Sequence, residues 1–164
     1  MVIPDLLTHV ESTVLWGLAA TVALTTVLMG SQGLGLSRLS LPYLVGTFFS
    51  GSRSAAYVVG STVYLLGGWI FAFGYSWVFL FLEQGSWWLG GALGLVHGLF
   101  LLVVVLPMLP HLHPRMATEY DGPTALQRLE PPGFMGLHYG RRTPLTTLFG
   151  HLLYGVILGA TAPV

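Results

Sequence analysis

Four long apolar runs without a charged residue restrict this chain to one class of fold. They begin at Ser12, Ser54, Trp87 and Pro144. Crossing about 30 Å of hydrocarbon takes roughly 20 residues of α-helix, and each run supplies about that length or more. We therefore predict an all-α fold, a four-helix transmembrane bundle that forms a single membrane domain over residues 1–164. The predicted spans are about 13–32, 55–82, 87–109 and 144–162.

The composition indicates the same class of protein. Hydrophobic residues make up 54% of the chain and charged residues only 7%, whereas about a quarter of the residues of a soluble domain are charged. No cysteine is present, which excludes disulfides and iron–sulfur clusters. Six acidic and six basic residues balance, so nothing favours binding to nucleic acid. The N-terminus lacks the basic stretch of a cleavable signal peptide, so we expect the first run to remain as a span.

The basic residues predict the orientation. All six are arginines, and they lie in the two loops that follow the first and third spans: Arg38, Arg53, Arg115, Arg128, Arg141 and Arg142. The opposite side carries only acidic residues: Asp5, Glu11 and Glu83. By the positive-inside rule both long loops are cytoplasmic and both termini lie outside. In the second loop we expect Arg115, Arg128, Arg141 and Arg142 to contact lipid or a partner.

Both long loops contain an apolar, aromatic stretch, at residues 39–49 and 129–139, which we expect to lie on the membrane surface. The two halves also align with each other, pairing Pro42 with Pro132 and Gly46 with Gly136. One interpretation is a pair of parallel helix-hairpin repeats, an arrangement found in some transporters. The other is chance, because glycine-rich apolar segments align easily.

Glycine is abundant, with 22 residues, and several lie four apart on one helix face. The third span has such a face at Gly90, Gly94 and Gly98, and the fourth at Gly155 and Gly159. Small residues let helix backbones approach closely, which is how spans associate in lipid. We therefore interpret these faces as helix-packing surfaces. The alternatives are a pore lining or a surface that docks a partner subunit.

Two histidines, His97 and His151, lie within the predicted spans, each on the glycine face of its helix. An ionisable residue inside the membrane is a candidate functional residue. From their depths we expect the two rings to come within about a helical turn of each other. They are our candidate cofactor-binding residues, for a haem, a shared metal or a proton relay. The alternative is that each neutral ring hydrogen-bonds a neighbouring helix and only stabilises the bundle.

A second candidate site lies where the third span ends. Met108, His111, His113 and Met116 combine thioether and imidazole ligands, which suit copper(I). The alternative is a loop that packs against the base of the bundle. The chain has no lysine, no phosphate-binding glycine loop and no zinc-protease helix, and no span contains an acidic residue. We therefore expect no catalytic residues and no enzymatic activity.

Several motifs in the last third of the chain form a recognisable set: His113–Met116, Glu130–Gly133, Gly140–Pro144, and a span with His151, Tyr154, Gly155 and Gly159. In these motifs the chain resembles a group of small, uncharacterised bacterial multi-span membrane proteins with domains of unknown function. The resemblance is fainter in the first hairpin. It implies a location in the bacterial inner membrane, and it brings no activity and no assigned site residues.

Three functional hypotheses follow. The first is a non-enzymatic accessory or scaffold subunit of a larger membrane complex, with lipid and either another protein or further copies of itself as partners. The second is a small oligomeric transporter or channel built from two parallel hairpins. The third is a haem- or copper-binding redox protein that uses the buried histidines. The sequence itself identifies no cofactor.

Overall fold

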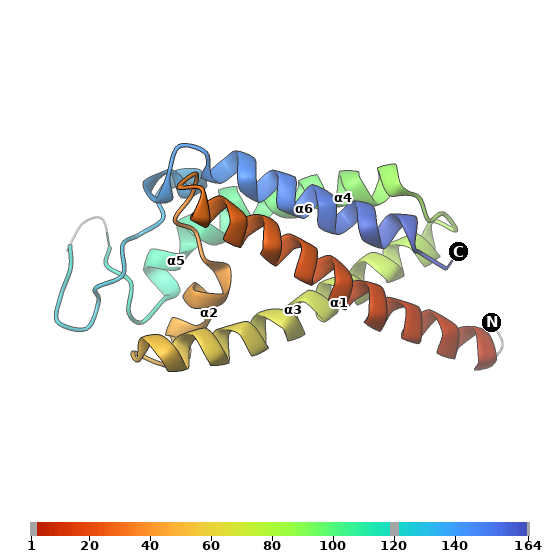
Figure 1. The fold of residues 1–164 in the computed structure, drawn as a ribbon, viewed down its shortest axis with the longest axis horizontal. Coiled ribbons are helices and arrows are strands. Elements are labelled where there is room, and N and C mark those ends of the chain that lie inside the picture. The colour runs from red at the N-terminus through yellow and green to blue at the C-terminus, as the bar shows by residue number, and fades with distance from the viewer. Residues whose placement is uncertain (1–2, 119–121, 164) are drawn as a thin grey trace. The chain divides into compact units, whose positions relative to one another are not determined.

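The protein is an all-α four-helix transmembrane bundle (Figure 1). The structure is a computed structural model, and it describes residues 3–118 and 122–163. Within those residues the elements are α1 (Ile3–Gly33), α2 (Leu41–Phe49), α3 (Arg53–Phe81), α4 (Trp87–Phe100), a π-helical turn (Leu101–Val105), α5 (Leu106–Leu112), a 3₁₀ helix (Phe134–Tyr139) and α6 (Thr143–Ala160).

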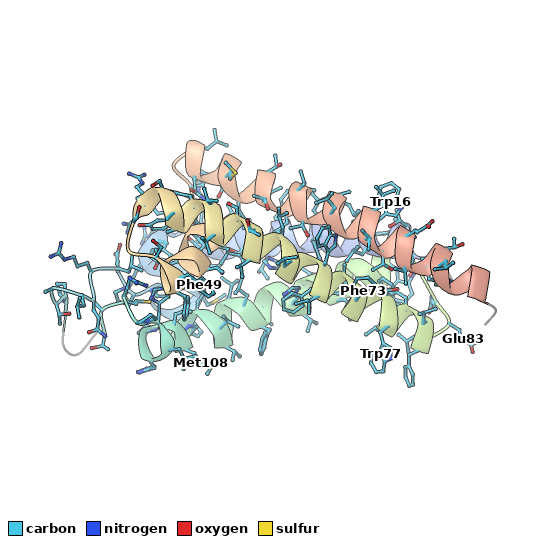
Figure 2. The ribbon with its side chains drawn as sticks, turned by 90° about the horizontal axis from the view of Figure 1, so that it is seen from below. Trp16, Phe49, Phe73, Trp77, Glu83 and Met108 are labelled. Atoms are coloured by element: carbon cyan, nitrogen blue, oxygen red, sulfur yellow. The ribbon has the colours of Figure 1, made fainter. Side chains whose placement is uncertain are left out.

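Four helices are long and apolar enough to cross a membrane, as the sequence predicts for an integral membrane protein. They cover Leu7–Gly33, Arg53–Phe81, Trp87–Leu112 and Thr143–Ala160. Their outer surfaces carry large apolar side chains. Figure 2 shows Trp16 and Trp77 pointing outward from α1 and α3, and the side chain of Trp77 is 67% exposed. Such surfaces suit hydrocarbon and not water.

The third span runs three residues further than predicted. We expected Pro107 and Pro110 to end it near Leu109, but the helix continues to Leu112. A proline has no N–H to donate and its ring clashes with the carbonyl four residues earlier. At Pro107 the π-helical turn accommodates the ring, because the N–H of Leu106 bonds the carbonyl of Leu101, five residues back, and shifts the hydrogen-bond ladder by one position before this proline. Pro110 lies within the last turns of α5, which ends at Leu112.

The chain divides into two compact units, each assembled from segments that are far apart in the sequence. The first unit comprises Met1–Val27, Leu65–Gly98 and Leu148–Val164. The second comprises Leu28–Tyr64 and Leu99–Thr147. Parts of all four long helices contribute to the first unit, whereas α2, α5 and the long loops lie in the second.

Glycine contacts hold the helices of the first unit close together. A Cβ atom added at Gly90 would overlap the carbonyl of Gly155, and one added at Gly94 would overlap the carbonyl of His151. In α3, a Cβ atom at Gly68 would collide with the side chain of Thr21 on α1. The pairs α4/α6 and α1/α3 therefore meet at positions where only glycine fits, which is the packing mode expected for spans in lipid.

The second unit is tied together by its loops. Ser37 and Thr143 share a hydrogen bond of 2.8 Å between their hydroxyl oxygens, and the backbone N–H of Arg38 donates to the carbonyl of Tyr139 at 2.6 Å. The guanidinium of Arg38 forms an ion pair with Glu130 at 2.8 Å. These contacts join the loop after α1 to the segment before α6.

Helix α2 lies against the start of α3 within the second unit (Figure 1). A Cβ at Gly46 would overlap the carbonyl of Ala56, and one at Gly60 would overlap the carbonyl of Pro42. The segment that aligns with α2 in the proposed repeat has another conformation. There Met135 and Gly136 have φ values of 54° and 72° inside the 3₁₀ helix. The similarity between the halves therefore does not extend to the conformation of these loop segments.

Candidate functional site

His97 on α4 and His151 on α6 lie next to each other in the first unit. Their ring centroids are 4.9 Å apart and the ring planes meet at 77°, an edge-to-face contact. His97 lies about 10 residues from the start of its span, which is roughly 15 Å along the helix axis. The prediction that these two rings approach each other is confirmed.

Glycines on α4 make room for His151. The backbone of His151 lies against Gly94, and its Cβ lies 3.1 Å from the position of a Cβ added at Gly98. Any larger residue at either position would occupy the space of the histidine or force α4 away from α6. The same glycine face that packs the two helices therefore holds the imidazole between them, and His151 is only 2% exposed.

Three aromatic residues surround the pair: Phe71 and Tyr75 of α3 and Tyr154 of α6. The ring centroid of Phe71 is 4.2 Å from that of His97. The hydroxyl of Tyr75 lies 3.3 Å from Nδ1 of His97, and the hydroxyl of Tyr154 donates to the carbonyl of Gly68 at 2.7 Å.

Sequence reasoning missed these aromatic residues as parts of the site. A signal was present, because Phe71 and Tyr75 lie four apart on one helix face and Tyr154 lies three residues after His151.

The hydrogen bonds of His97 are incomplete. Among the residues that the structure describes, its ring is bonded only through Nδ1, to Tyr75, and Nε2 has no hydrogen-bond partner. The residue is partly exposed, and the preceding residue, Val96, is 65% exposed. A partly exposed histidine in the middle of a candidate span is thus bonded through only one of its two nitrogens within the described chain.

The geometry does not fit a haem held between the two histidines. Two axial imidazoles must point their nitrogens at one iron from opposite sides of the macrocycle. Here the rings touch edge to face, and α4 and α6 are in backbone contact at Gly90 and Gly94, which leaves no slot for a flat ring system between them.

The second candidate site, at Met108, His111, His113 and Met116, is divided between surface and interior. His111 is exposed and the side chain of Met108 is half-exposed, whereas His113 and Met116 are buried. Within residues 3–118 and 122–163 there is no group of three or more His, Asp or Glu side chains placed to hold a metal ion. Copper binding by this set therefore gains no support from the geometry.

His113 instead fastens the loop to α2. Its Nε2 lies 3.0 Å from the hydroxyl of Thr47 and 3.2 Å from the carbonyl of Leu44, and its Nδ1 accepts the backbone N–H of Arg115 at 3.1 Å. Both nitrogens are thus occupied, and a neutral ring with the hydrogen on Nε2 satisfies all three contacts. Burial lowers the pKa of His113, and the positive charge of Arg115 lowers this pKa further.

The arginines have separate roles. Arg115 donates to the carbonyls of Thr47 and Phe48, which end α2, a favourable place for a cation at a helix C-terminus. The Glu130 carboxylate raises the pKa of Arg38, which lies in the other loop. Four further arginines are exposed and form no ion pair with the rest of the described chain: Arg53, Arg128, Arg141 and Arg142.

Comparison with known proteins adds no assignment. No family model matches the chain, and no curated protein and no solved structure is similar to it.

Proposed function

We propose that this chain is a non-enzymatic accessory subunit of a larger membrane complex, and that it docks through the edge of the first unit where His97 reaches the surface. One observation carries the proposal. The Nε2 atom of His97 has no hydrogen-bond partner in the described chain, and the residue is partly exposed among apolar side chains in the middle of a span.

Hydrocarbon cannot satisfy such a nitrogen. A buried polar group left without a hydrogen bond costs about 1–3 kcal/mol, and the lipid oxygens lie at the two interfaces, roughly 15 Å from this depth. Polar side chains that face lipid at this level mark contacts with other membrane proteins or functional pathways. A neighbouring span that supplies the missing hydrogen bond would remove this cost.

The test is native purification in a gentle detergent followed by mass spectrometry. A partner at fixed stoichiometry should accompany the wild-type chain and be lost from His97→Leu. The matched control is Val96→Leu, which places the same side chain on the adjacent exposed position and should keep the partner. The proposal fails if the wild-type chain purifies alone as a monomer, or if both variants behave alike.

We also propose that the protein resides in a bacterial inner membrane with both long loops in the cytoplasm. The arginine distribution supports this orientation, and the exposed Arg141 and Arg142, directly before α6, suit contact with anionic headgroups. The chain has no cysteine, so single-cysteine variants report orientation directly. A membrane-impermeant thiol reagent added to intact cells should label Gln84→Cys in the short turn and spare Ala125→Cys in the long loop. The reverse pattern would overturn the orientation.

A further inference from the structure

Resting on the docking edge proposed above, we infer that the partner presents an oxygen acceptor, carried by one of its own transmembrane helices, to the Nε2–H group of His97. The inference depends on which ring nitrogen carries the hydrogen. Tyr75 decides this, because its hydroxyl is the only group bonded to the ring among the described residues.

Two arrangements of hydrogens are possible at this contact. If the Tyr75 hydroxyl donates to Nδ1, the neutral ring carries its hydrogen on Nε2, and one donor is left without a partner. If Nδ1–H donates to the phenol oxygen instead, the Tyr75 hydroxyl hydrogen and the Nε2 lone pair both lack partners. Tyr75 is only 7% exposed and makes no other hydrogen bond in the described chain, so the second arrangement leaves two groups unsatisfied. The first is therefore favoured.

The acceptor must reach the middle of the membrane. Ester and phosphate oxygens of lipids lie at the interfaces, roughly 15 Å away along the helix axis. A transmembrane helix can carry an oxygen to this depth on a Ser, Thr, Asn, Gln, Asp or Glu side chain, and such contacts join helices in membranes.

The surface of α3 beside His97 leaves room for a helix. A Cβ added at Gly67 or at Gly74 would meet no atom within 4 Å, and Phe71, which contacts the His97 ring, lies between these two positions. The other helical glycines of the first unit all face another segment: Gly17, Gly68, Gly90, Gly91, Gly94, Gly98, Gly150, Gly155 and Gly159. At these two positions, no side chain of the described protein stands between α3 and an approaching helix.

Two amide substitutions at His97 distinguish a partner bound to Nε2 from a partner bound to Nδ1. His97→Gln places an amide N–H near the position of Nε2, whereas the shorter His97→Asn reaches only the position of Nδ1. We expect His97→Gln to retain the subunit that co-purifies with the wild-type chain. His97→Asn should weaken the association about tenfold, the loss of one hydrogen bond in a site without water. Tyr75→Phe should weaken the association less, because the ring is then free to place its hydrogen on either nitrogen.

A second measurement tests the hydrogen position without any partner. Nitrogen-15 NMR of the purified, histidine-labelled chain should show His97 as the neutral form with the hydrogen on Nε2, and Tyr75→Phe should change that signal. A hydrogen on Nδ1 would overturn the inference and leave the accessory role standing. Purification without any partner would overturn the accessory role itself. The inference also fails if His97→Asn retains the partner while His97→Gln loses it. It fails equally if the purified chain carries one lipid-soluble carbonyl compound per chain at this site in place of a protein partner.

Discussion

Replacing Gly90 with alanine should destabilise the protein, whereas the same replacement at Gly74 should not. The added Cβ at Gly90 would overlap the carbonyl of Gly155 and lie 2.8 Å from the Cα of Gly159, where ordinary contacts begin at 3.4 Å. Helices α4 and α6 would have to separate by roughly 1 Å, a gap that forfeits a quarter to a half of the attraction between facing atoms. Overpacking of this kind costs about 1–3 kcal/mol.

Gly74 is the matched control, because a methyl group there meets open space. In the interior of a helix, Gly→Ala stabilises by up to about 1 kcal/mol. The assay is reversible unfolding in mixed micelles by increasing the fraction of SDS, monitored by circular dichroism and tryptophan fluorescence. Gly90→Ala should lower the midpoint, Gly155→Ala should do the same, and Gly74→Ala should leave it unchanged or raise it. Equal stability of Gly90→Ala and wild type would refute the close packing of α4 on α6.

Three other variants test other parts of the structure. Gly74→Leu should leave the unfolding midpoint close to that of wild type, because the new side chain enters space that is open in this protein. The same variant should abolish co-purification of the partner in native mass spectrometry, because this space is where we expect the partner helix to dock. Glu83→Gly should raise the free energy of unfolding by up to about 1 kcal/mol, and the midpoint with it, since Glu83 adopts a φ of 50° just after α3, a conformation that suits glycine. A lower midpoint would contradict this. His113 has a lowered pKa in the folded state, so the folded chain binds fewer protons than the unfolded chain. The stability that it contributes is complete above the ordinary pKa of 6.5 and is lost as the pH falls through the folded pKa. Unfolding midpoints between pH 8 and pH 4 should therefore decline less in His113→Gln than in wild type, while the exposed His111→Gln should follow wild type.

The sequence predicts the spans well because hydrophobic length is a local property. It also places His97 and His151 together, because depth in a membrane follows from position along a helix. It does not predict the π-helical turn before Pro107, because this turn depends on a shift in backbone hydrogen bonding, and it does not predict that the helix continues past Pro110 to Leu112.

Contacts between distant segments were also beyond sequence reasoning. Tyr75 bonds His97 only because α3 packs beside α4 at one particular rotation, and no local pattern encodes that rotation. The pairing of Arg38 with Glu130 joins residues of two different loops, and other acidic and basic residues of those loops offered equally good partners on charge alone.

The bonds from Ser37 and Arg38 to Thr143 and Glu130 have a consequence for biosynthesis. The ribosome synthesises the loop that contains Ser37 and Arg38 long before it reaches the residues with which these two side chains bond. Until Glu130 and Thr143 have emerged, the Arg38 guanidinium lacks its carboxylate and the Ser37 hydroxyl lacks its threonine partner. The second unit therefore becomes complete only after these later residues have been synthesised, and a chain truncated before residue 130 would expose loops that lack their hydrogen-bond and ion-pair partners.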